Sequence, residues 1–264
     1  MSKLEILLPF LATYNIALAT QSLVDSGIYN ASSFRILGGK VAPFTAYPYM
    51  VSLRWYPNEH FCAGTILNHL WVLTAAHCVV REYSDTVFAV VGTDMLNFGG
   101  YAVKVRKIIM HPRYNDTGYE SNDIAMIKLR SALKYSATIS PVVLGTAVYQ
   151  SAINVTLIGW GETSNHGPKS NKLRELSTQT ISQAACSLYW PYLFTTDLIC
   201  TKFQSGKGHC KGDSGGPLIR TNSKTQVGVI SLHHSRGCGK MFADVFGRVS
   251  SYVNWIQHII NLQG

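Results

Sequence analysis

A serine lies in a glycine-rich heptapeptide toward the C-terminal end of the chain, between Lys211 and Pro217. Glycine adopts backbone conformations that other residues avoid, so such a turn can expose the Ser214 hydroxyl and aim backbone N–H groups at one point. A nucleophile beside donors for a developing oxyanion is what acyl transfer requires. Taken alone, the heptapeptide is equally compatible with an ordinary glycine–serine loop.

Two other segments offer the base and the acid that such a serine needs. His77 differs from the other eight histidines because it follows an apolar run, 66–73, and adjoins a cysteine that can fix its loop. Asp123 stands at the mouth of an apolar segment, 124–129, and a carboxylate buried there needs a hydrogen-bonded partner. The alternatives are a surface or core histidine and a turn aspartate ahead of a strand.

The elements that must position these residues are mostly strands. Short apolar runs recur between turn signals and predict strands at 49–55, 86–91, 102–110, 155–158 and 226–232. Apolar residues at helical spacing from Val249 to Ile260 predict a final amphipathic helix. A chain of 264 residues with 47% hydrophobic and 14% charged residues is typical of a well-packed globular protein. Two small barrels that share a cleft fit this length.

The first residues have the character of a secretory signal peptide, which we place at 1–19. Lys3 precedes an apolar stretch, 6–18, that is too short to span a bilayer, and small residues at 17–19 suit signal peptidase. Six cysteines agree with secretion, although an even set of six allows fifteen pairings. A zinc site is the weaker interpretation, because no Cys-x-x-Cys pair occurs. We therefore expect a secreted, extracellular protein.

The net charge is +9, and it stays +9 when residues 1–35 are removed. Such a charge can favour anionic surfaces or polysaccharides. Because the basic residues are scattered and no run of five occurs, a merely basic secreted protein is the preferred interpretation. Nucleic-acid binding has no motif in its support.

Three Asn-x-Ser/Thr sequons are candidate glycosylation sites in a secreted chain. They begin at Asn30, Asn115 and Asn154. Asn154 opens a predicted strand, which makes it the weakest of the three.

Taken in the order His77, Asp123, Ser214, the sequence resembles the chymotrypsin-like (S1) serine endopeptidases. Supporting matches are Ile36-Leu37-Gly38-Gly39, Gly159-Trp160-Gly161 and Tyr252-Val253-Asn254-Trp255-Ile256, so the resemblance runs from Ile36 to about Ile260. It implies an all-β fold of two six-stranded antiparallel β-barrels with a C-terminal α-helix. The peptidase domain would then span 36–264, with the active site in the cleft between the barrels.

The resemblance also implies the roles of the site residues. Ser214 attacks the scissile carbonyl, His77 transfers the proton, and Asp123 holds the imidazole. The backbone N–H groups of Gly212 and Ser214 form the oxyanion hole. Ser231 matches a position whose hydroxyl helps to hold the triad acid, with an ordinary strand serine as an equally good alternative.

A zymogen activation site and a disulfide pattern follow from the same resemblance. Cleavage after Arg35, at the end of an activation propeptide, 20–35, would free an ammonium group on Ile36 that inserts beside Asp213. A buried carboxylate next to the oxyanion loop is costly unless it is paired. The disulfides that the family implies are Cys62–Cys78, Cys186–Cys200 and Cys210–Cys238.

The sequence departs from the family at the substrate pocket. Trypsin-like members carry aspartate at the pocket floor, where this chain has Gly208 followed by His209. Ser231-Leu232-His233 stands where Ser-Trp-Gly is common, and Asp244 aligns with a second floor position. If His209 binds and neutralises Asp244, an aromatic or aliphatic P1 residue is expected, which is the favoured interpretation. If Asp244 faces the pocket, the specificity is trypsin-like or broad; an acidic P1 residue ranks third.

The resemblance implies no cofactor. The loop that binds calcium in some family members, here 92–100, has one carboxylate, so we expect no calcium or other metal site. The expected partners are protein or peptide substrates, an activating trypsin-like protease and protein protease inhibitors, with no nucleic acid or membrane; a monomer is expected. The alternative of another class is a non-catalytic homologue that binds or regulates. A lipase or esterase is disfavoured, because there the histidine comes last in the chain.

Overall fold

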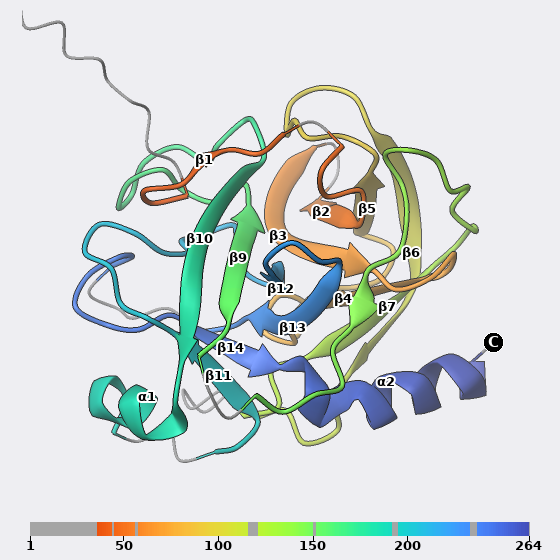
Figure 1. Ribbon diagram of the computed structural model, residues 1–264. Coiled ribbons are helices and arrows are strands. Elements are labelled where there is room, and N and C mark those ends of the chain that lie inside the picture. The colour runs from red at the N-terminus through yellow and green to blue at the C-terminus, as the bar shows by residue number, and fades with distance from the viewer. Residues whose placement is uncertain are drawn as a thin grey trace, which may run out of the picture. The chain divides into compact units, whose positions relative to one another are not determined.

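Two closed barrels of β-strands account for most of the structure (Figure 1). The computed structural model describes residues 36–43, 45–55, 58–115, 121–149, 152–191, 195–232 and 237–263. The expected signal peptide and activation propeptide, including Asn30 and Arg35, lie outside the described residues, and so does His233.

The first barrel closes in the strand order β2-β3-β4-β7-β6-β5, and all its pairings are antiparallel. Strand β6 shows why such a sequence folds this way: Val103 and Val105 are buried while Lys104 and Arg106 are exposed, the period of two that a half-buried strand requires. The strands are β2 (Met50–Trp55), β3 (Glu59–Ile66), β4 (Trp71–Thr74), β5 (Val87–Val91), β6 (Tyr101–Met110) and β7 (Ala125–Leu129).

The second barrel closes through β9, which pairs with both β10 and β12, in the order β9-β10-β11-β14-β13-β12. Two short strands extend it: β1 pairs with β10, and β8 pairs in parallel with β13. Its strands are β1 (Lys40–Val41), β8 (Val143–Leu144), β9 (Asn154–Gly159), β10 (Arg174–Ile181), β11 (Leu198–Thr201), β12 (Pro217–Arg220), β13 (Thr225–Ile230) and β14 (Val245–Arg248). The predicted fold of two six-stranded antiparallel barrels is confirmed.

Two helices complete the part of the fold that the structure describes. The predicted C-terminal helix is α2 (Val249–Gln263), whereas α1 (Gln183–Tyr189) was not predicted. Helix α1 has seven residues and buries only Cys186, so it shows no apolar stripe. Its one local signal is Ser182, whose side chain accepts a hydrogen bond from the Ala185 N–H as an N-cap.

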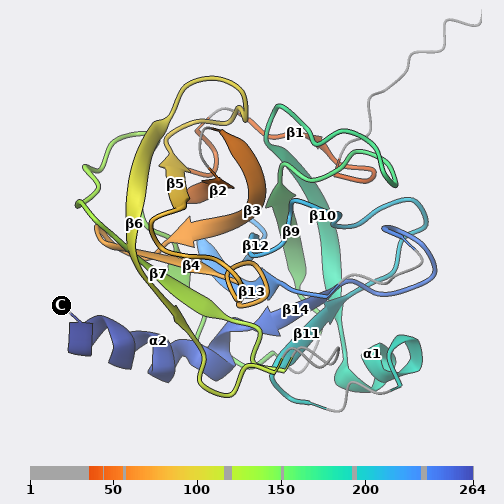
Figure 2. The same ribbon diagram turned by 180° about the vertical axis from the view of Figure 1, so that it is seen from behind.

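Helix α2 leaves the second barrel and packs against the first (Figures 1 and 2). Val249, Tyr252 and Ile256 are buried in the same apolar cluster as Met126 and other first-barrel residues. The rings of Tyr252 and Trp255 also meet that of His111, which follows β6, at centroid distances of 5.5 and 5.0 Å. The last helix therefore ties the two barrels together.

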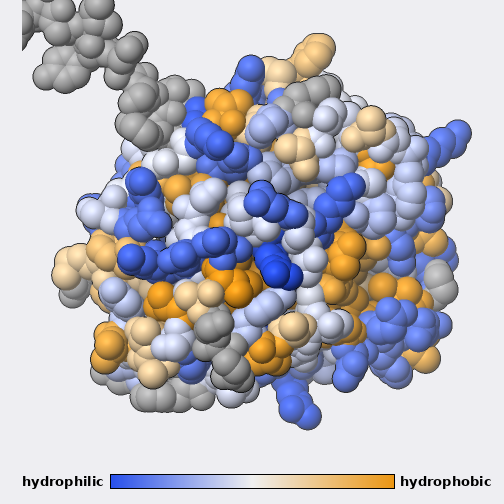
Figure 3. Space-filling model, viewed as in Figure 1, coloured by the Kyte–Doolittle hydropathy of each residue, from blue (hydrophilic) through white to orange (hydrophobic). Residues whose placement is uncertain are grey.

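On the face shown in Figure 3, hydrophilic side chains are interspersed with smaller apolar groups. Neither described helix has the length and apolar character needed to cross a membrane.

Candidate active site

The loop that carries Ser214 is built on two glycines with positive φ, Gly212 at +95° and Gly215 at +77°. A Cβ atom at Gly215 would lie 2.2 Å from Thr74 Oγ1 and 2.5 Å from the Ala63 carbonyl oxygen, so only glycine fits there. The Ala63 N–H donates to the Ser214 carbonyl oxygen at 2.8 Å. Strands β3 and β4 of the first barrel thus hold the serine, although its loop belongs to the second barrel.

His77 and Asp123 are joined by two hydrogen bonds. His77 Nδ1 donates to Asp123 Oδ2 at 2.7 Å, and the His77 backbone N–H donates to Oδ1 at 2.8 Å. Ser231 Oγ donates to the same Oδ2 at 2.5 Å. The carboxylate is buried, and each of its oxygens has a donor.

These contacts decide the charge of the carboxylate. Burial alone would raise the pKa of Asp123, but the charge on His77 and the hydrogen bonds from His77 and Ser231 outweigh it and hold the pKa below its usual value. Asp123 is therefore an anion at neutral pH, and it fixes the imidazole with Nδ1 protonated.

Ser214 and His77 line one open cavity of about 480 Å³ together with Gly212. Within the described residues, the N–H groups of Gly212 and Ser214 donate to no protein acceptor. An aromatic pair forms another wall, because the rings of Trp55 and Phe61 stack with centroids 4.5 Å apart. A ligand in this cavity therefore meets the serine, the histidine and two unused N–H donors.

The Gly159-Trp160-Gly161 motif makes room for Asp213, the residue before the serine. A Cβ atom at Gly159 would lie 2.0 Å from Asp213 Oδ1, and one at Gly161 would lie 2.3 Å from Oδ2. The Gly161 N–H donates to Oδ1 at 2.6 Å, and the Cys210 N–H donates to Oδ2 at 2.9 Å. The two glycines are thus explained by the space that this carboxylate occupies.

Asp213 has no cationic partner among the described residues. Burial raises its pKa to about 7, a rise that the two backbone hydrogen bonds only partly offset. Ile36 is also fully buried, and its φ of +35° is one that a β-branched residue rarely adopts. The Gly208 N–H donates to the Leu37 carbonyl oxygen at 3.1 Å, so the start of the domain lies along the pocket wall.

His60 holds the same loop and was missed in the sequence. Its Nε2–H donates to the Gly212 carbonyl oxygen at 2.8 Å, while Nδ1 accepts from Ser52 Oγ at 2.8 Å. Burial lowers the pKa of His60 to about 3, so the ring is neutral. No local signal marks it, because a single histidine in an apolar strand is compatible with any core position.

Asp244 covers Gly208 in the pocket that the sequence predicts to bind substrate. A Cβ atom at Gly208 would lie 2.6 Å from Asp244 Oδ2, so the carboxylate fills the space of a side chain at residue 208. The His209 backbone N–H donates to Oδ2 at 3.2 Å. The Asp244 side chain is 17% exposed and lines the pocket with the largely apolar side chains of Trp190, Leu232, Phe242 and Ala243.

The His209 ring does not neutralise Asp244. Its Nε2 lies 3.7 Å from Asp244 Oδ1 and has no hydrogen-bond partner. Burial lowers the pKa of His209 to about 4, so the ring is uncharged. Burial also raises the pKa of Asp244 to about 7, which makes a proton, rather than a histidine, the group that can neutralise this carboxylate. Ser231 is not among the described lining residues, since its hydroxyl faces Asp123.

Three disulfides brace the site. They are Cys62–Cys78, Cys186–Cys200 and Cys210–Cys238, the pairs that the resemblance implies. The one described cluster with metal-ligand spacing is Cys62, His77 and Cys78. Its two sulfurs are bonded to each other, so neither is a thiolate that could bind a metal.

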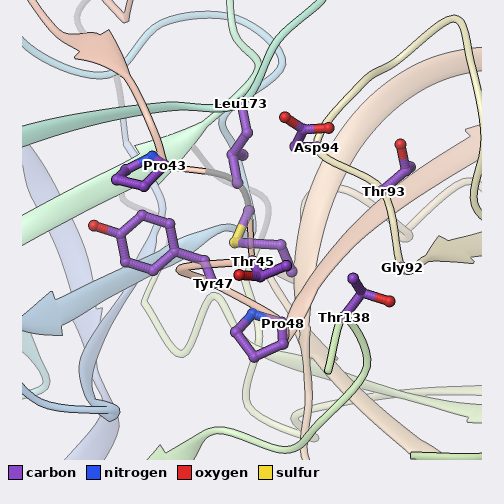
Figure 4. Close-up of a pocket in the computed structure, with 10 residues that line it drawn as sticks. Pro43, Thr45, Tyr47, Pro48, Gly92, Thr93, Asp94, Thr138 and Leu173 are labelled. Carbon is purple, nitrogen blue, oxygen red and sulfur yellow. The ribbon is translucent and has the colours of Figure 1, made fainter. Parts of the chain in front are cut away.

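A second hollow, shown in Figure 4, lies apart from these residues. Pro43, Tyr47, Pro48 and Leu173 form its apolar walls, and Asp94 is its one carboxylate. It contains no serine or histidine among its described lining residues, so it lacks the groups for acyl transfer.

Two of the three candidate glycosylation sites fall within the described residues. Asn115 is exposed in the loop after β6. Asn154 is exposed at the start of β9, where its Oδ1 accepts a hydrogen bond from Gln179 Nε2 at 2.9 Å.

Comparison with known proteins agrees with this geometry. The Trypsin family model matches residues 36–256. Trypsin 5G1 of Aedes aegypti is 33% identical over 237 residues, which cover 88% of this chain and 87% of that protein. Chymotrypsin-2 of Vespa crabro is 35% identical, covering 84% and 98%, and trypsin II-P29 of Gallus gallus is 35% identical, covering 87% and 91%. The chain therefore belongs to the trypsin family and is a chymotrypsin-like serine endopeptidase.

Proposed function

We propose that Ser214, His77 and Asp123 carry out the hydrolysis as a catalytic triad. Ser214 Oγ attacks the scissile carbonyl carbon while His77 Nε2 takes its proton, and the protonated imidazole then gives that proton to the leaving amine. Water attacks the resulting acyl-enzyme by the same route in reverse. The observation that carries this proposal is the hydrogen-bond chain Ser231–Asp123–His77, which ends in the cavity that Ser214 lines.

The N–H groups of Gly212 and Ser214 stabilise the oxyanion. Both are without a protein acceptor among the described residues, and Gly212 keeps its positive φ while His60 holds its carbonyl group. Loss of one donor of this type costs about 3 kcal/mol of transition-state stabilisation.

The test is a Ser214→Ala variant compared with the wild type after activation. We expect turnover of peptide substrates to be lost and labelling by a fluorophosphonate to disappear, with an unchanged melting temperature, because only the nucleophilic oxygen is removed. A wild-type protein that is cleaved after Arg35 but takes no label would instead be a non-catalytic homologue that binds or regulates.

For specificity, we propose an aromatic or aliphatic P1 residue when Asp244 is protonated and acceptance of a basic P1 residue when it is ionised. The largely apolar lining of Trp190, Leu232, Phe242 and Ala243 supports the first, and the partly exposed carboxylate over Gly208 supports the second. The relatives do not decide between them, because both trypsins and a chymotrypsin are among them.

For activation, we propose that the protein is a secreted zymogen cleaved after Arg35 by a trypsin-like protease. Three disulfides agree with an oxidising compartment. The new ammonium group on Ile36 would pair with Asp213, whose buried carboxylate has no described cation beside it. Protein protease inhibitors that fit the cleft are further expected partners, and the exposed Asn115 is the best-placed described glycosylation site.

A further inference from the structure

We propose that the outer face of β6 and β7 binds an anionic polysaccharide. Six cations that lie up to thirty residues apart in the sequence come together on or beside these two strands: Lys104, Arg106, Lys107, Lys128, Arg130 and Lys134. We call them the β6–β7 cationic face. None of them belongs to the catalytic site or the substrate pocket, so this proposal is independent of the proposed mechanism.

A bulge in β6 increases the density of charge on this face. The register shifts between Val105 and Lys107, so that one extra residue, Arg106, is inserted opposite β7. Lys104, Arg106 and Lys107 are all exposed, whereas strict alternation would have turned one of the last two inward.

Strand β7 places further cations opposite those of β6. Lys107 and Lys128 are direct cross-strand partners, and the Arg130 N–H donates to the Lys104 carbonyl oxygen at 2.9 Å. Neighbouring strands lie about 4.8 Å apart, and like charges placed opposite each other destabilise a sheet. The pairs Lys107–Lys128 and Lys104–Arg130 therefore lower the stability of the folded protein. A bound polyanion would neutralise both pairs and remove this repulsion.

Protein groups compensate only part of this charge. Among the described residues, no carboxylate lies within salt-bridge distance of Lys104, Arg106, Lys107, Arg130 or Lys134. The Lys107 Nζ donates to Gln263 Oε1 at 3.1 Å and Lys128 Nζ to the Gln263 carbonyl oxygen, at the C-terminal end of α2. Figures 1 and 2 show this end of α2 beside β6 and β7. Lys104, Arg106, Arg130 and Lys134 have no such acidic or helix-end contact.

The surroundings favour a sugar polymer over other polyanions. Tyr135, which is 40% exposed and follows Lys134 in the chain, stacks on His69 with ring centroids 3.8 Å apart. Flat exposed rings beside cations suit a chain of anionic sugars. The three disulfides also indicate an oxidising compartment, where glycans are the common polyanions and anionic cytoplasmic lipids are not met.

The test compares two triple variants of the full chain that lose the same charge. K104Q/R106Q/K134Q removes half of the β6–β7 cationic face, and K202Q/R220Q/K224Q removes three exposed cations from other parts of the molecule. With heparin as the probe at physiological salt, we expect the Kd to rise at least tenfold for the first variant and less than twofold for the second. We also expect the slope of log Kd against the logarithm of the salt concentration to fall by roughly two for the first variant and to stay unchanged for the second, by analogy with other polyanions.

Both variants should keep the wild-type kcat/KM for a short peptide, because the substituted residues are exposed and outside the site. Neither should have a lower melting temperature than the wild type, since the first variant removes the like-charge contact between Lys104 and Arg130. Equal losses in the two variants would overturn the proposal, since net charge alone would then explain binding. So would the absence of wild-type binding to heparin, or equal binding to desulfated heparin. Tighter binding to duplex DNA or to phosphatidylserine vesicles than to heparin would assign the face to a different partner.

Discussion

Asp244 lies where any side chain at residue 208 would otherwise stand. In the specificity that we propose, its protonation decides what the base of the pocket offers to a substrate. Its pKa is raised to about 7 by burial, which means that the carboxyl is neutral below pH 7 and ionised above it. An ionised, partly desolvated carboxylate attracts a basic P1 side chain, whereas a protonated one does not. Specificity at the residue scale is therefore expected to depend on pH.

We predict that the ratio of kcat/KM for an Arg to a Phe P1 substrate rises up to tenfold per pH unit between about pH 6 and 8, because Asp244 ionises in this range. Measuring the ratio removes the common contribution of His77, which must be unprotonated for both substrates. The Asp244→Asn variant is the control and should give a flat, low ratio. A wild-type ratio that is equally flat would show that Asp244 does not reach the P1 side chain.

The sequence predicted some of these residues better than others. His77, Asp123 and Ser214 each lie in a recognisable local motif, so their contacts could be anticipated. The link between Asp213 and the glycines at 159 and 161 could not, because it depends on two loops more than fifty residues apart meeting in space. The two ring nitrogens of His60 bind Ser52, eight residues away, and Gly212, 152 residues away. Neither contact leaves a local pattern in the sequence.

At the scale of elements, α2 contributes its buried stripe to a cluster that both barrels share. We predict that Ile256→Ala lowers the free energy of unfolding by about 2–5 kcal/mol, because it removes a fully buried side chain and leaves a cavity. Urea denaturation measures this loss, and kcat under native conditions should be unchanged.

Leu262→Ala is the matched control in the same helix, because that side chain is 65% exposed and its truncation should cost less than about 0.5 kcal/mol. Similar losses for the two variants would mean that the packing of α2 on the barrels contributes little to stability.

The predicted elements were five strands, β2, β5, β6, β9 and β13, whose apolar runs are short and bounded by turns, and helix α2; the remaining strands were not predicted. The predicted strand 226–232 is the instructive exception, since β13 ends at Ile230. The next residue, Ser231, still donates its N–H to the Val245 carbonyl oxygen at 3.3 Å, while its hydroxyl binds Asp123, a contact that hydrophobicity does not encode. Helix α1 escaped detection because it is held by its N-cap and the Cys186–Cys200 disulfide instead of an apolar stripe.

At the scale of the whole molecule, the proposed activation should change how stability depends on pH. In the uncleaved chain the pKa of Asp213 is about 7, against 3.8 for an ordinary carboxyl, so the unfolded state ionises first as the pH rises. We predict that the free energy of unfolding therefore falls between about pH 4 and 7, by at most about 1.4 kcal/mol per pH unit from this group.

After cleavage, an ammonium group beside Asp213 would lower its pKa and remove this loss. The comparison is best made in Ser214→Ala protein, before and after cleavage by trypsin, since self-digestion is then absent. Parallel pH profiles for the two forms would show that Ile36 does not pair with Asp213.

The distribution of charge over the surface could not be predicted from the sequence. The basic residues look scattered along the chain, yet six of them share one face because β6 and β7 pair. Strand register, and the bulge at Arg106 in particular, decides which side chains become neighbours, and neither can be read from composition.

The position of α2 has a consequence for how the protein is made. Val249, Tyr252 and Ile256 belong to a cluster that includes residues of both barrels, and they follow every strand of both barrels along the chain. Because synthesis runs from the N-terminal end, every strand leaves the ribosome before the helix that packs on them. A nascent chain that has released all its strands still lacks these three side chains, so the apolar surface that they cover stays exposed until α2 has emerged.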